Sequence, residues 1–102
     1  MIKHRIGSLD DFGPGTLTRV EVGKAELCVA RTQEAELYVV SDRCSHEGAS
    51  LSDGDLYGNQ VECPMHSSAF DLATGAVRSL PALSPIRAFR VTVEAGSVYV
   101  EL

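Results

Sequence analysis

No apolar run in this sequence is long enough to cross a bilayer, and its first residues form neither the apolar core of a signal peptide nor a twin-arginine motif. These absences predict a cytoplasmic protein with no membrane segment. Four prolines and nine glycines among 102 residues, with 44% hydrophobic side chains, exclude disordered and collagen-like chains. Nine basic residues against 14 acidic ones give a net charge of −5, which argues against a nucleic-acid partner.

Cysteine is scarce and odd in number, since only Cys28, Cys44 and Cys63 occur. In a cytoplasmic chain this count favours metal or redox chemistry over a disulfide framework. The sequence shows no nucleophile–base pair and no glycine-rich phosphate loop, so the chain is not expected to be an enzyme. No apolar period of 3.6 residues persists over a dozen residues, which disfavours long helices.

Short runs rich in Val, Ile, Leu and Tyr recur between Gly, Asp, Ser and Pro residues. This pattern predicts a single all-β domain, a small antiparallel β sandwich or barrel. Hairpin turns are expected at residues 22–24 and 94–96. The expected strands are residues 2–6, 16–22, 25–31, 36–41, 60–63, 69–71, 86–94 and 97–101.

The segment 42–71 differs from the rest, because it is rich in glycine and poor in β-branched residues; we interpret it as a loop-rich insertion. It contains Cys44 and His46 and, after 16 further residues, Cys63 and His66. Each half offers one thiolate and one imidazole from a tight turn. The pattern C-x-H-x16-C-x-x-H therefore predicts that these four side chains bind one metal centre.

The mixed ligand pairs narrow the choice of metal. Structural zinc sites commonly pair Cys with Cys and His with His, whereas each turn here holds one of each. Blue copper requires a single Cys ligand, and two are offered. A [2Fe–2S] cluster with two thiolates on one iron and two imidazoles on the other fits this donor set. A structural zinc site remains the alternative.

The motif C-x-H…C-P-x-H resembles the Rieske signature. Further stretches resemble the Rieske-type ferredoxins of bacterial aromatic-ring dioxygenase systems, and the resemblance covers essentially the whole chain. Those stretches are residues 50–54, 61–64, 70–75, 80–82 and the final hairpin, 91–100. The resemblance implies a β base, residues 1–41 and 81–102, and a cluster-binding subdomain of about residues 42–80.

The same resemblance implies that Cys44 and Cys63 hold the inner iron of one Rieske [2Fe–2S] cluster, and that His46 and His66 hold the outer, solvent-facing iron. It implies a one-electron carrier, reduced by a flavin-containing, NAD(P)H-dependent reductase and oxidised by a terminal Rieske oxygenase. We expect a monomer in isolation that forms transient interfaces. The alternative functions are the Rieske-like small subunit of an assimilatory nitrite reductase and a zinc-bound interaction module.

Three residues near the four proposed ligands are expected to influence the reduction potential of the cluster. Ala49 and Met65 stand where high-potential Rieske proteins carry a disulfide, and Phe70 stands where they carry a tyrosine aimed at a sulfur. These differences predict a potential in the lower part of the Rieske range of about −150 to +300 mV. Residues 81–85 are expected to cover the cluster, and Cys28 is expected to be a buried small hydrophobic side chain.

The remaining candidate residues are expected to be neither ligands nor catalytic groups. His4 is expected to be a solvated surface histidine, and Asp42, Asp53 and Asp55 solvated loop carboxylates or turn caps. Six acidic residues and one basic residue lie in the segment 42–71. The excess of −5 thus falls in the cluster-binding segment, where it is expected to steer basic partners.

Overall fold

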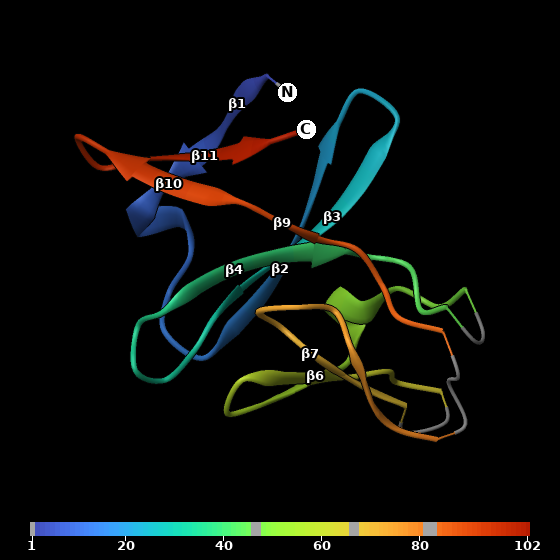
Figure 1. Ribbon diagram of the computed structural model, residues 1–102. Helices are drawn as coiled ribbons and strands as arrows, with labels where there is room; N and C mark the ends of the chain where they lie inside the picture. The colour runs from blue at the N-terminus through green and yellow to red at the C-terminus, as the bar shows by residue number, and fades with distance from the viewer. Residues whose placement is uncertain (1, 46–47, 66–67, 81–83) are drawn as a thin grey trace.

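The computed structural model describes residues 2–45, 48–65, 68–80 and 84–102, which form three antiparallel sheets (Figure 1). The all-β prediction is confirmed. The first sheet has the order β1 (Lys3–Ser8), β11 (Ser97–Glu101), β10 (Val91–Glu94). The central sheet has the order β2 (Thr16–Val22), β3 (Ala25–Arg31), β4 (Leu37–Ser41), β9 (Ala88–Phe89). The third sheet has the order β5 (Asp55–Tyr57), β6 (Gln60–Glu62), β7 (Ala69–Asp71), β8 (Val77–Ser79).

Two-residue turns set the registers of two hairpins. Residues 23–24 join β2 to β3, and residues 95–96 join β10 to β11. Ala95 and Gly96 have φ angles of 49° and 78°. Positive φ at both positions is the requirement of a type I′ turn, whose twist matches that of the flanking strands. Both predicted turns are confirmed.

The central sheet is buried on both faces, because it lies between the other two sheets (Figure 1). Successive side chains of a strand point to opposite faces. Along β3, Leu27 and Val29 therefore enter a core shared with the first sheet, while Cys28 and Ala30 enter a second core. That second core is shared with the third sheet and contains Cys44, Leu51, Val61, Cys63, Phe70, Leu72 and Ile86.

Some elements differ from the predicted ones. Strands β5 and β8 were not expected, and the run 86–94 is divided at Arg90, where the chain leaves the central sheet at β9 and enters the first sheet at β10. Two 3₁₀ turns, η1 (Leu9–Asp11) and η2 (Leu51–Asp53), are also present. Within the described ranges, no helix has the length and apolar character needed to cross a membrane.

Candidate metal centre

Two loops of the same construction carry the cysteines of the motif. An antiparallel residue pair closes each loop, and inside it the cysteine amide donates a hydrogen bond to the carbonyl group five residues further along. The closing pairs are Arg43–Ser50 and Glu62–Ala69, and the hydrogen bonds run from Cys44 N to Ala49 O (2.8 Å) and from Cys63 N to Ser68 O (2.7 Å). The backbone of each loop thus fixes the position of its cysteine.

Cys44 and Cys63 are each 2% exposed and lie in the core between the central and third sheets. Two buried thiols presented by matching loops to one core form a donor set that suits the thiolate half of a mixed [2Fe–2S] site. His46 and His66 lie outside the described residues, each within the loop of its cysteine. In the part of the chain that is described, no group of three or more metal-binding side chains occurs.

Asp42 joins the two ends of the Cys44 loop through a carboxylate that is almost fully buried. The residue is 2% exposed. Its Oδ1 accepts a hydrogen bond from the Ser52 amide (2.8 Å), its Oδ2 accepts one from the Ser50 hydroxyl, and its carbonyl accepts one from the Leu51 amide (2.6 Å). The prediction of a solvated Asp42 is wrong, because these donors replace water around the carboxylate.

Arg19 connects this carboxylate to the central sheet. The Arg19 Nε lies 3.4 Å from Asp42 Oδ2, and its Nη2 lies 3.0 Å from Glu21 and 3.1 Å from Glu26. Arg43 also pairs with Glu26, at 3.6 Å. The sequence contained no signal for this network, because Arg19 and Asp42 stand 23 positions apart on β2 and beyond β4. The network holds the loop against the sheet.

The chain beyond residues 81–83 is bonded to the Cys44 loop and to the turn between β7 and β8. The Ser45 hydroxyl donates to the Ser84 carbonyl (2.5 Å), and the Ile86 amide donates to the Gly75 carbonyl (2.9 Å). Residues 81–83 themselves lie outside the described ranges. The expectation that they cover the cluster therefore stays a prediction.

A model of the Rieske [2Fe–2S] domain family matches residues 3–90. This chain belongs to the Rieske [2Fe–2S] domain family. It is 42% identical over 97 residues to the ferredoxin CarAc of Metapseudomonas resinovorans, covering 94% of this chain and 90% of that protein. It is 37% identical over 94 residues to the ferredoxin component of the p-cumate 2,3-dioxygenase system of Pseudomonas putida, covering 91% and 80%.

Solved structures similar to this chain were also found. A chain in the complex of reduced oxygenase and oxidized ferredoxin in carbazole 1,9a-dioxygenase superimposes with a TM-score of 0.89 at 41% identity, covering 97% of this chain and 92% of that one. A nitrite reductase small subunit from Mycobacterium tuberculosis superimposes with a TM-score of 0.86 at 19% identity, covering 97% and 93%. The second likeness shows a shared fold alone.

The protein is thus a Rieske ferredoxin of the type that serves aromatic dioxygenase systems as their electron-carrying component, and not a catalytic subunit. Its cofactor is a Rieske [2Fe–2S] cluster. The zinc module and the nitrite reductase subunit are not supported as alternatives, because the near full-length relatives above 35% identity are ferredoxins.

Other predicted residues of this Rieske ferredoxin lie as follows. Cys28 is 0% exposed, as predicted, and burial, with a smaller effect of the Asp42 charge, raises the pKa of its thiol to about 12. Phe70 is fully buried in the same core and has no hydroxyl to donate to a sulfur, whereas Met65 is 59% exposed. His4 is half-buried in β1, so the prediction that it is solvated holds only in part. The low potential stays a prediction.

Proposed function

We propose that this ferredoxin carries single electrons from a flavin-containing, NAD(P)H-dependent reductase to the terminal Rieske oxygenase of an aromatic-ring dioxygenase system. The observation that carries the proposal is the similarity, over almost the whole chain, to ferredoxins of such systems. One of the similar structures holds a ferredoxin together with its oxygenase. The cytoplasm, where NAD(P)H is available, is the proposed location.

We propose Cys44 and Cys63 as ligands of the inner iron and His46 and His66 as ligands of the outer iron. The matching loops and the shared burial of the two thiols support the cysteine half, and the spacing of the motif supports the histidine half. When bound, the cluster supplies a one-electron redox couple. The residues around the thiols exclude water and hold both sulfurs in a fixed position, which lowers the reorganisation that each transfer requires.

The proposed division of the chain is a β base, residues 1–41 and 81–102, and a cluster-binding subdomain of about residues 42–80. The third sheet, β5–β8, lies wholly within the second part, and strands β1–β4 and β9–β11 lie in the first, which supports the division. We propose a monomer in isolation, since an electron shuttle must release each partner before it meets the next.

Exposed carboxylates near the Cys63 loop offer an encounter surface for basic partners. Asp53 and Asp55 are exposed, as expected, and Asp55 lies directly opposite Glu62 in the β5–β6 pair. Like charges opposite each other cost stability. Two like charges placed together beside Cys63 attract basic surfaces, which supports a role in steering partners rather than in folding.

The test is a two-step electron transfer with purified, cluster-loaded protein in the absence of oxygen. A panel of reductases with NADH or NADPH is mixed with the ferredoxin, and reduction is followed by the change in its visible absorbance. The reduced ferredoxin is then mixed with oxygenases that have bound substrate, the carbazole 1,9a-dioxygenase oxygenase among them. Transfer in both steps with one pair supports the proposal.

A permanent subunit would behave differently. If the native protein from its host co-eluted with a large reductase in gel filtration, and no oxygenase of the panel oxidised it, the shuttle would be ruled out.

A further inference from the structure

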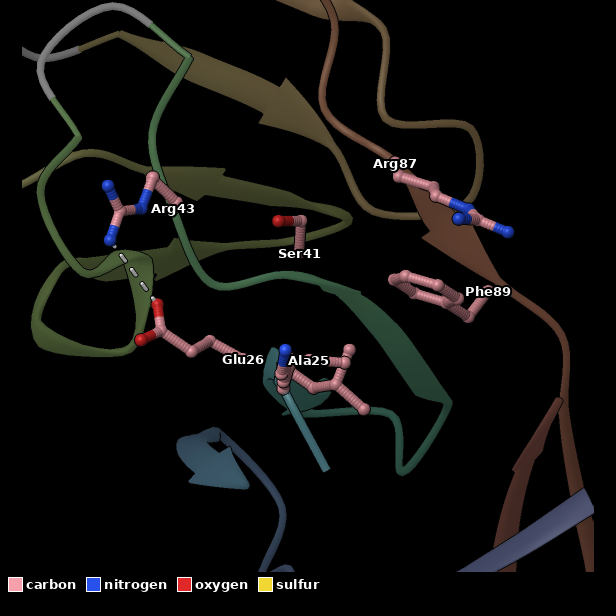
Figure 2. A pocket seen from close by; sticks show the side chains of 8 residues that line it. Ala25, Glu26, Ser41, Arg43, Arg87 and Phe89 are labelled. Carbon is pink, nitrogen blue, oxygen red and sulfur yellow. Dashed lines mark ion pairs between the residues drawn. The ribbon is translucent and has the colours of Figure 1, made fainter. Parts of the chain in front are cut away.

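A groove opens beside the Cys44 loop, where β3 begins, β4 ends and β9 begins. Figure 2 shows Arg43 and Arg87 on opposite sides of this groove, with Ser41 between them and Phe89 and Ala25 below. Lys24, in the β2–β3 turn, is the third basic residue that lines the groove. The function described above makes no use of this groove.

The groove lies on one face of the central sheet. Leu27 pairs with Ser41 in the β3–β4 register, and the Ser41 amide donates to the carbonyl of Arg87, the residue before β9, at 2.8 Å, so these three residues stand in a row. Side chains in such a row share one face. Leu27 and Phe89 contribute to the core shared with the first sheet. The groove is therefore the end of this face that lies towards the Cys44 loop.

The charge of the groove is opposite to that of the whole chain. Three of the nine basic residues line it, although the net charge of the protein is −5. Its one acidic residue, Glu26, is already paired with Arg19 and Arg43. Among the described residues, neither Lys24 nor Arg87 has a carboxylate partner, and the Arg87 guanidinium is held 4.8 Å above the Phe89 ring. The groove thus offers unpaired positive charge beside an aromatic wall.

We propose that this groove docks an acidic segment of the ferredoxin's redox partner proteins. The inference rests on the proposed transfer of electrons between proteins, and it names the chemistry of one contact. Carboxylates of the partner would meet Lys24 and Arg87, while its basic residues would meet the exposed Asp53 and Asp55. A face that carries both signs fixes the orientation of a docked partner, whereas a uniformly acidic face permits several. Arg43 directly precedes Cys44, so docking here brings the partner beside the cluster-binding loop.

The experiment compares two double variants of the cluster-loaded protein. Lys24→Gln with Arg87→Gln removes two charges from the groove, and Lys3→Gln with Arg5→Gln removes two exposed charges from β1. Stopped-flow absorbance gives the second-order rate of electron transfer with the reductase and with the oxygenase at several ionic strengths. Calorimetric titration with a hexaglutamate peptide measures acidic docking without any electron transfer. Iron content confirms that each variant keeps its cluster.

The groove variant is expected to slow transfer with at least one partner about tenfold at low salt and to flatten the salt dependence, while the β1 variant changes the rate less than about twofold. Hexaglutamate is expected to bind the wild type and the β1 variant, and not the groove variant. Equal effects of both variants, faster transfer in the groove variant, or equal peptide binding by all three proteins would overturn the proposal. If the wild type transferred no electrons, the proposed function would fail, and the peptide titration would still decide the nature of the groove.

Discussion

Asp42 shows how one buried carboxylate can hold the Cys44 loop in place. Its carboxylate is 2% exposed, is bonded by the Ser50 hydroxyl and the Ser52 amide, and lies 3.4 Å from Arg19. Removing the charge of a buried carboxylate weakens every contact that it makes where water cannot replace them, which costs more than an exposed pair contributes. The loop of Cys44 therefore depends on this carboxylate.

We expect Asp42→Asn to lower the free energy of unfolding by about 2–4 kcal/mol, because Arg19 loses its buried partner and the hydroxyl of Ser50 loses a charged acceptor. We also expect a lower iron content per purified chain. Urea denaturation and iron analysis measure the two effects. Asp53→Asn is the matched control, since Asp53 is exposed in the same stretch of chain. Equal stability and iron content in the two variants would contradict the role given to Asp42.

The buried thiol of Cys28 is expected to make the stability of the protein depend on pH. An ordinary thiol has a pKa of about 8.5, whereas the pKa of Cys28 in the folded chain is about 12. Between these values the unfolded chain releases a proton that the folded chain keeps, so stability falls as pH rises, by up to about 1.4 kcal/mol per pH unit. Below pH 8 the contribution is fully present.

The measurement is urea unfolding of the wild type and of Cys28→Ala at several pH values between 8 and 11. The stability advantage of the wild type is expected to shrink by up to about 3 kcal/mol over this range. All other residues are common to both proteins, so their contributions cancel in the difference. Parallel pH profiles would mean that Cys28 titrates normally in the folded chain.

At the scale of elements, the third sheet is held close to the first ligand loop by one glycine. A Cβ atom at Gly54 would lie 1.9 Å from the Glu62 carbonyl oxygen, far inside van der Waals contact. The Gly54 φ of −89° is open to any residue, so the requirement is steric. Glu62 directly precedes Cys63, and a displaced Glu62 would move the Cys63 thiol.

Gly54→Ala is expected to destabilise the protein by about 2–4 kcal/mol and to reduce cluster content. Gly13→Ala is the control, because an added Cβ there meets only the Thr16 Cγ2, at 3.8 Å. Urea midpoints report the stability change, and absorbance of the cluster reports loading. Similar midpoints for the two variants would show that the β6 backbone yields to the added methyl group.

A strand can be predicted from the sequence when the pattern that indicates it lies within the strand itself. The runs at residues 16–22 and 97–101 alternate or are rich in β-branched residues, and the run at residues 25–31 has a continuous apolar centre. All three form the expected strands. β5 and β8 have only three residues each and include charged side chains, as β6 and β7 also do, so a local pattern separates such short strands poorly from loops. They exist because β6 and β7 offer paired edges, which is tertiary information.

At the scale of the whole molecule, the negative charge on the folded surface differs from what the charge of segment 42–71 indicated. All of the net −5 falls within residues 42–71, yet Asp42 pairs with Arg19 and Asp71 with Arg78, both from outside that segment. The Thr74 hydroxyl, with the nearby Arg78, also lowers the pKa of Asp71 and keeps it charged. The acidic surface available to partners is therefore smaller and more local than the sequence indicated.

The four residues that we propose as ligands were predicted from their spacing, because the spacing of ligands is a property of a short stretch of chain. The layered arrangement that buries Cys44 and Cys63 could not be predicted in this way. It depends on the alternation of Leu27, Cys28, Val29 and Ala30 between two cores, and on which sheet covers each face. Those contacts join residues far apart in the sequence.

The central claim is that two matching loops hold one [2Fe–2S] cluster through Cys44 and Cys63, with Cys28 uninvolved. The most direct test is the content of iron and acid-labile sulfide per chain in the wild type and in Cys44→Ser, Cys63→Ser and Cys28→Ser. Two iron and two sulfide are predicted for the wild type and for Cys28→Ser, with loss of both in the other two variants. One zinc without sulfide in the wild type, or a full cluster in Cys44→Ser or Cys63→Ser, would contradict the claim.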